Sequence, residues 1–193
     1  QGTMMMIRGF LRASAAAVVL AITGAPAAAA VFSAGETIVR QGLAVQGIYI
    51  QEVKMTGEHA GHGDHHGGDH GHGHNMPGMH LEAVIKMAEE GHGFPVGAWV
   101  PYLDVDYTLT KQGSDWSAQG PLVPMLANDG PHYGANVSMP GPGKYTLRFR
   151  IAPPSEDVFP RHFDQETGIG PWLEPFEVSW EFTYVGIGKK GGY

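Results

Sequence analysis

The sequence predicts an all-β protein: an immunoglobulin-like β-sandwich of about seven or more strands. Apolar and polar residues alternate in several short runs, which is the pattern of half-buried strands. The 193 residues include 29 glycines and 14 prolines, which supply frequent turns. No run of residues has the repeat of a convincing amphipathic helix. There are no cysteines, so such a sandwich would lack the disulfide of antibody domains.

Seven runs are expected to form strands. In the run KYTLRFRIA at 144–152 the apolar residues would form one face that packs in the core. The segment 111–120 is polar and is expected to be a hairpin loop, and 153–171 is a long loop of the kind that often carries function. The expected strands are 43–55, 80–88, 99–110, 121–125, 133–139, 144–152 and 175–185.

Residues 1–30 have the pattern of a cleaved signal peptide. Arg8 and Arg12 precede the short apolar run 15–22, and small residues follow up to Ala30. The apolar run is shorter than the roughly 20 residues of a membrane-spanning helix. We therefore expect cleavage near Ala30 and a soluble protein in the periplasm, with residues 31–193 forming a single domain.

Composition excludes several classes of function. Without cysteine the chain cannot form disulfides, iron–sulfur clusters, thiolate zinc sites or a type 1 copper centre. The net charge of −7 makes nucleic acid an unsuitable partner and suits the capture of cations. Neither a Ser-His-Asp arrangement nor the paired carboxylates of a hydrolase is recognisable. The composition therefore favours binding over catalysis.

A low-complexity insert at 58–79 is rich in Gly, His and Asp. It has too few apolar residues to form a core, so we expect a loop between two strands. Its imidazoles would gather Zn²⁺, Cu²⁺ or Ni²⁺ weakly, although a solvated loop with incidental histidines is the alternative. The seven auxiliary candidates are His59, His62, His65, His66, His70, His72 and His74.

Two pairs of residues outside the insert could bind a metal. Met125 and His132 flank a turn at 128–131 that would bring a thioether and an imidazole to one point, and these ligands suit copper. On a strand, His80 and Glu82 would project to the same face and supply half of a site. The alternatives are an ordinary core methionine beside a turn histidine, and the exposed polar face of an edge strand.

Several longer segments resemble a known family. HLEA, PMLANDGPHYGANV, GKYTLRFRIAPP and RHFDQETGIGPWLEPFEVSWEF are similar to periplasmic high-affinity iron-transport proteins of the P19, FetP and Tp34-like type. The resemblance runs from about Gly47 to the C-terminus, the insert excepted. It implies an immunoglobulin-like sandwich, a homodimer, a copper site near the subunit interface, and action beside an FTR1-like inner-membrane iron permease.

The resemblance also implies a set of metal ligands, and all five matching positions are present. Imidazoles, a thioether and a carboxylate can hold Cu(II) or Cu(I), and the carboxylate also suits iron, manganese or zinc. Three acidic residues, Asp129, Asp164 and Glu166, could orient the imidazoles, although turn formation explains them equally well. The implied ligands are His80, Glu82, Met125, His132 and His162.

These observations favour a non-enzymatic, periplasmic metal-binding protein of iron uptake that binds copper and iron. Two alternatives stay open: a periplasmic copper or zinc chaperone or buffer, for which the insert is the main argument, and a copper-dependent Fe(II) oxidase. Since no ligand is a thiolate, protonation of the histidines below about pH 6 is expected to release the metal.

Overall fold

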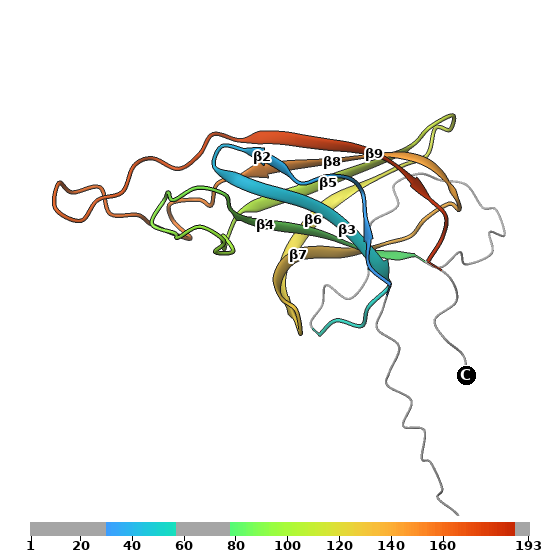
Figure 1. The fold of residues 1–193 in the computed structure, drawn as a ribbon, viewed down its shortest axis with the longest axis horizontal. Coiled ribbons are helices and arrows are strands. Elements are labelled where there is room, and N and C mark those ends of the chain that lie inside the picture. The colour runs from blue at the N-terminus through green and yellow to red at the C-terminus, as the bar shows by residue number, and fades with distance from the viewer. Residues whose placement is uncertain (1–29, 57–77, 188–193) are drawn as a thin grey trace, which may run out of the picture.

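A computed structural model describes residues 30–56 and 78–187 and confirms the all-β prediction (Figure 1). Nine strands and no helix occur in these two ranges, so they contain no helix that could cross a membrane. The strands are β1 (Phe32–Ser33), β2 (Ile38–Arg40), β3 (Leu43–Gln51), β4 (Met79–Met87), β5 (Asp104–Lys111), β6 (Ser117–Ala127), β7 (Gly130–Val137), β8 (Gly143–Ala152) and β9 (Phe176–Tyr184).

All nine strands belong to one antiparallel sheet that folds over on itself. Its order is β1-β3-β4-β7-β6-β5-β8-β9, and β2 also pairs with β3. The long strand β6 joins the two layers, because its first half pairs with β5 and its second half with β7. The layers meet closely at Gly47 of β3, where a Cβ would lie 3.0 Å from Leu147 of β8. The result is a sandwich of the predicted kind.

Alternation along each strand determines which side chains enter the core. Tyr145, Leu147, Phe149 and Ile151 of β8 are all fully buried, as the sequence pattern predicts. In β4 the odd-numbered residues from Met79 to Met87 fill the same core. The even-numbered residues of β4 therefore lie on the outer face of the sheet.

Some predicted boundaries are wrong. Residues 117–120 belong to β6 and not to a hairpin loop, because they pair with β5 although they lack an apolar alternation. The strand expected from 99 begins only at Asp104, since Tyr102 has a positive φ of 60° that interrupts an extended chain. The short strands β1 and β2 were not predicted. β4 begins at Met79, which the predicted insert range included.

Candidate metal centre

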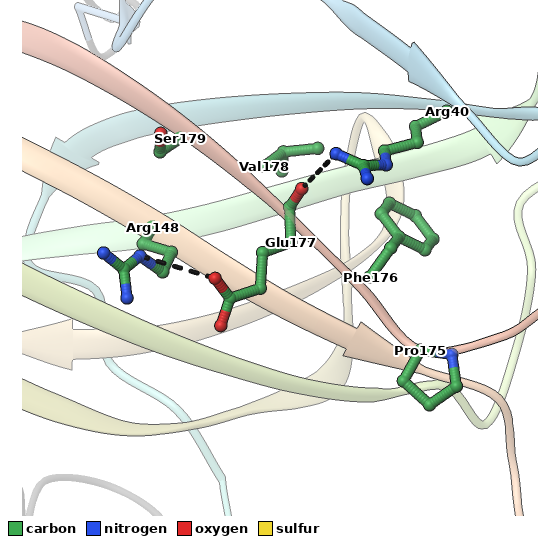
Figure 2. Close-up of a pocket in the computed structure, with 7 residues that line it drawn as sticks. All are labelled: Arg40, Arg148, Pro175, Phe176, Glu177, Val178 and Ser179. Atoms are coloured by element: carbon green, nitrogen blue, oxygen red, sulfur yellow. Dashed lines mark hydrogen bonds and ion pairs between the residues drawn. The ribbon is translucent and has the colours of Figure 1, made fainter.

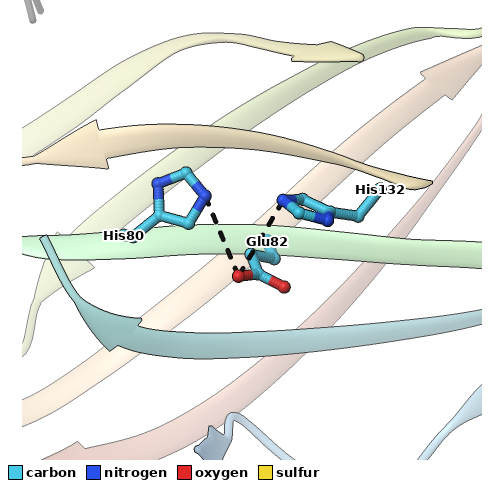
Figure 3. Close-up of side chains that lie close together, drawn as sticks. All are labelled: His80, Glu82 and His132. Carbon is cyan, nitrogen blue, oxygen red and sulfur yellow. Dashed lines mark ion pairs between the residues drawn. The ribbon is translucent and has the colours of Figure 1, made fainter. Parts of the chain in front are cut away.

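Two imidazoles and a carboxylate converge on the outer face of β4 and β7. Figure 3 shows the rings of His80 and His132 turned toward the Glu82 carboxylate. The distance to Glu82 Oε1 is 3.8 Å from His80 Nε2 and 3.9 Å from His132 Nε2. One ligand atom of each residue lies within 4.8 Å of the other two. This spacing leaves room for one cation between the three atoms.

The three side chains are buried although they are polar. His80, Glu82 and His132 are 1%, 5% and 4% exposed, the low values that ordinarily belong to core residues. β4 lies between β3 and β7 and is not an edge strand, so the interpretation of an exposed polar face is wrong. On β3, Ile48 and Ile50 lie opposite Glu82 and His80 and help to exclude water.

The Nε2 atoms of both histidines are buried and have no hydrogen-bond partner. Their distances to Glu82 Oε1 are too long for hydrogen bonds. Such orphaned atoms are destabilising unless something fills the gap. A cation between the three residues would bond two nitrogens and one oxygen, which is a donor set suited to Cu(II), Zn²⁺ or Fe(II).

Burial shifts the pKa values of His80 and Glu82. Desolvation lowers the pKa of His80, partly offset by the hydrogen bond to Asn136, while the neighbouring His132 lowers it further. Desolvation raises the pKa of Glu82; His132 opposes this rise and Asp129 adds to it. The charged forms of His80 and Glu82 are therefore disfavoured until a cation arrives. A neutral imidazole has its lone pair free for a metal.

Two residues that the sequence did not single out shape the site. Gly134 lies opposite Glu82 on β7, and a Cβ there would be 2.8 Å from His80 Nε2, so only glycine leaves room for this ring position. Asn136 lies opposite His80, and its Oδ1 is 3.0 Å from His80 Nδ1. The motif letters GPHYGAN contain both residues, but their roles depend on the register between β4 and β7.

Met125 lies on the same face as the cluster. It is the direct cross-strand partner of His132, so their Cβ atoms are expected about 4.5–5.5 Å apart. The connection between β6 and β7 is the short turn at Asn128 and Asp129. The register across this turn puts Met125 and His132 on the same side of the β6–β7 hairpin, as the sequence predicts. Met125 itself is half-buried.

His162 does not join the cluster within one chain. Its side chain is 75% exposed, and its Nδ1 contacts Thr167 Oγ1 at 2.8 Å. It lies in the loop between β8 and β9, which extends beyond the end of the sheet opposite the start of β4 (Figure 1). Asp164 and Glu166 lie in the same loop, and hydrogen bonds from Thr167 lower the pKa of Asp164. These two acids therefore do not orient the cluster.

The auxiliary histidines of the insert, from His59 to His74, lie outside the described residues, as do residues 1–29 of the expected signal peptide. A hollow of about 540 Å³ on β2, β8 and β9 is a separate surface feature (Figure 2). Its polar side chains have partners: Arg40 donates a hydrogen bond to the Glu177 backbone carbonyl, and Arg148 lies 3.7 Å from the Glu177 carboxylate. It offers no unpaired group comparable to those of the cluster.

Fold and site together define the class: a β-sandwich protein with a buried candidate metal centre on the outer face of one layer. The chain belongs to the iron-transport family described as Fe²⁺ transport protein, which matches residues 28–186. The description of this family is that of a transport protein for a metal ion.

Relatives and solved structures agree with this assignment. A UPF0423 protein of Brucella abortus is 42% identical over 160 residues, which cover 79% of this chain and 80% of the relative. The 34 kDa membrane antigen of Treponema pallidum is 39% identical over 153 residues, covering 72% and 66%.

Two solved structures are similar over most of the chain. FetP of uropathogenic Escherichia coli has a TM-score of 0.68 and 38% identity, and the match covers 82% of this chain and 99% of FetP. Copper-reconstituted P19 of Campylobacter jejuni has a TM-score of 0.69 and 34% identity, covering 83% and 99%. A FetP variant has also been solved with copper bound. The predicted family resemblance is thereby confirmed.

Proposed function

We propose that this chain is a periplasmic metal-binding component of high-affinity iron uptake that binds copper at His80, Glu82 and His132. The observation that carries the proposal is the pair of buried, unpaired Nε2 atoms facing one carboxylate oxygen. Copper-bound relatives at 34–37% identity support the choice of copper. The expected signal peptide supports export.

Met125 and His162 complete the proposed ligand set in different ways. Met125 projects beside His132 and supplies a soft sulfur that favours Cu(I). His162 lies on an exposed loop away from the cluster, so it reaches a metal only in a second copy of the chain. This arrangement agrees with the homodimer that the family resemblance implies.

Iron is the proposed cargo, and an FTR1-like inner-membrane permease is the proposed recipient. The Glu82 carboxylate supplies the harder oxygen donor that iron, and also manganese, prefers. The family's description as Fe²⁺ transport protein supports a role in transport over a role in copper or zinc buffering. In this proposal copper is a bound cofactor of the protein, and iron is the ion that is transported.

The test compares a reference protein, in which Met125 and His132 are retained, with a Met125→Ala, His132→Ala double variant. Both proteins carry glutamine in place of the seven histidines within residues 57–77, so that only the buried site contributes, and the reference differs from the double variant only at Met125 and His132. We expect the double variant to lose tight Cu(II) binding in competition titrations and to fail to restore growth under iron chelation. Unchanged copper affinity would contradict the site assignment.

Two further measurements separate the alternatives. A deletion strain that loses copper or zinc tolerance but grows normally on low iron would favour a chaperone or buffer. Copper-dependent turnover of Fe(II) under oxygen in a stopped-flow assay would favour an oxidase. We expect neither result, and we expect growth on low iron to require both this chain and the permease.

A further inference from the structure

The orientation of the Asn136 side chain is fixed by the backbone of Val53. The Val53 N–H donates to Asn136 Oδ1 at 3.3 Å, and Asn136 Nδ2 donates to the Val53 carbonyl at 2.8 Å. A flipped amide would place two donors face to face and two acceptors face to face. The oxygen of Asn136, and not its nitrogen, is therefore the atom that faces His80.

The Asn136 oxygen determines which nitrogen of the neighbouring His80 ring carries the proton. His80 Nδ1 is 3.0 Å from Asn136 Oδ1, which can only accept a hydrogen bond. His80 Nδ1 must then carry the proton, and in a neutral ring Nε2 keeps its lone pair. We propose that Asn136 is a positioning residue that fixes His80 as the Nδ1–H tautomer, with Nε2 presented to Glu82 and His132.

The other tautomer has no comparable partner. With the proton on Nε2, this nitrogen would be 3.8 Å from Glu82 Oε1, which is too far for it to donate a hydrogen bond. The lone pair on Nδ1 would face the lone pairs of Asn136 Oδ1 at 3.0 Å. Gly134 and the buried surroundings leave the ring little room to turn away, since Nε2 already occupies the space of a Cβ at position 134.

The inference deepens the proposed function and rests on it in one respect: the free lone pair on His80 Nε2 is important because it is the one that would bind the metal. Outer partners of this kind orient a metal-binding histidine and raise its basicity. Here the partner is itself held by the backbone of Val53, just after β3, so the position of Val53 is coupled to the orientation of His80.

The experiment is long-range ¹⁵N–¹H correlation spectroscopy of the full-length, metal-free protein, with His80 assigned by comparison with His80→Gln. We expect a protonated Nδ1 and an unprotonated Nε2. Asn136→Leu removes the acceptor at similar volume and should shift His80 toward a mixture of tautomers. Asn136→Asp retains an acceptor oxygen and should restore the Nδ1–H form. Asn128→Leu, on the same hairpin but without a contact to His80, is the matched control and should change nothing.

Zn²⁺ serves as the metal probe because it is diamagnetic and leaves the imidazole resonances observable. The His80 Nε2 resonance then reports binding at the buried site separately from binding at other imidazoles. We expect Asn136→Leu to weaken Zn²⁺ binding at His80 by about 10- to 100-fold, the usual effect of losing such a partner. A proton on Nε2 in the unsubstituted protein, or an unchanged tautomer in Asn136→Leu, would overturn the inference. If the tautomers behave as expected but no metal shifts Nε2, the inference stands and the proposed function fails.

Discussion

Replacing Gly134 with alanine should damage the metal site far more than the fold. The new Cβ would lie 2.8 Å from His80 Nε2 and 3.0 Å from Cε1, whereas ordinary contact begins near 3.4 Å. The ring must therefore move by roughly 0.6 Å, and metal–ligand distances tolerate about ±0.2 Å. The movement also strains the bond to Asn136. We expect copper affinity to fall at least about tenfold, which is about 1.4 kcal/mol.

The metal-free protein should tolerate the same change. Gly134 has no positive φ, so alanine suits its backbone, and in a strand interior alanine is favoured over glycine by about 0.5–1 kcal/mol. This gain offsets the loss of the hydrogen bond between His80 and Asn136, which is worth about 1 kcal/mol. Thermal unfolding without metal should therefore shift by no more than about 4 °C.

The assay is a Cu(II) competition titration with electron paramagnetic resonance spectra, in chains whose insert histidines are glutamine. Gly120→Ala is the control, since a Cβ at this position of β6 meets Tyr107 at an ordinary 3.4 Å. We expect Gly120→Ala to keep the copper spectrum and affinity. If Gly134→Ala also keeps both, the reasoning that glycine makes room for His80 is wrong.

Three further predictions concern neighbouring residues. Burial raises the pKa of Glu82, so in the metal-free protein the contribution of this group to stability is lost as the pH rises above the ordinary pKa of 4.5. Glu82→Gln should therefore stabilise the metal-free protein by about 1 kcal/mol at pH 7.5, which raises the melting temperature by about 2–4 °C. The same substitution should give no gain at pH 4. An equal gain at both pH values would contradict this. Met125→Leu should weaken Cu(I) binding more than Cu(II) binding in chelator competitions, and equal losses would exclude sulfur ligation. Tyr133→Phe removes a buried hydroxyl that bonds the backbone at Val100 and Leu103, and should reduce stability in denaturant titrations by about 1–3 kcal/mol while copper affinity stays unchanged.

Alternation predicted the strands that carry the core, because burial of one face imposes a period of two on the sequence. The run 144–152 is one case, since β8 occupies 143–152 and its apolar face is fully buried. The first residues of β6 were missed because Ser117 and its neighbours have no such period. They are extended only because they pair with β5, and the sequence of residues 117–120 alone does not indicate this pairing.

The candidate site was predictable to the extent that it depends on one strand or one hairpin. His80 and Glu82 share a face by the period of a strand, and Met125 meets His132 across a short turn. Gly134 was not predictable, because its role depends on which residue of β7 lies opposite Glu82. A slip of one residue would turn it to the other face, and no local pattern fixes that register.

The energetics of the three side chains without a bound cation favour a ligand-binding role over a packing role. Two orphaned imidazole nitrogens and a desolvated carboxylate each make the metal-free protein less stable than apolar side chains of similar size would. Gly134, which makes room for His80, adds the further penalty of glycine in a strand. A bound cation reverses the first two effects at once, because it bonds both nitrogens and neutralises the carboxylate, and binding to the folded state alone stabilises it. A packing role would favour removing these groups, whereas a metal role requires all of them together.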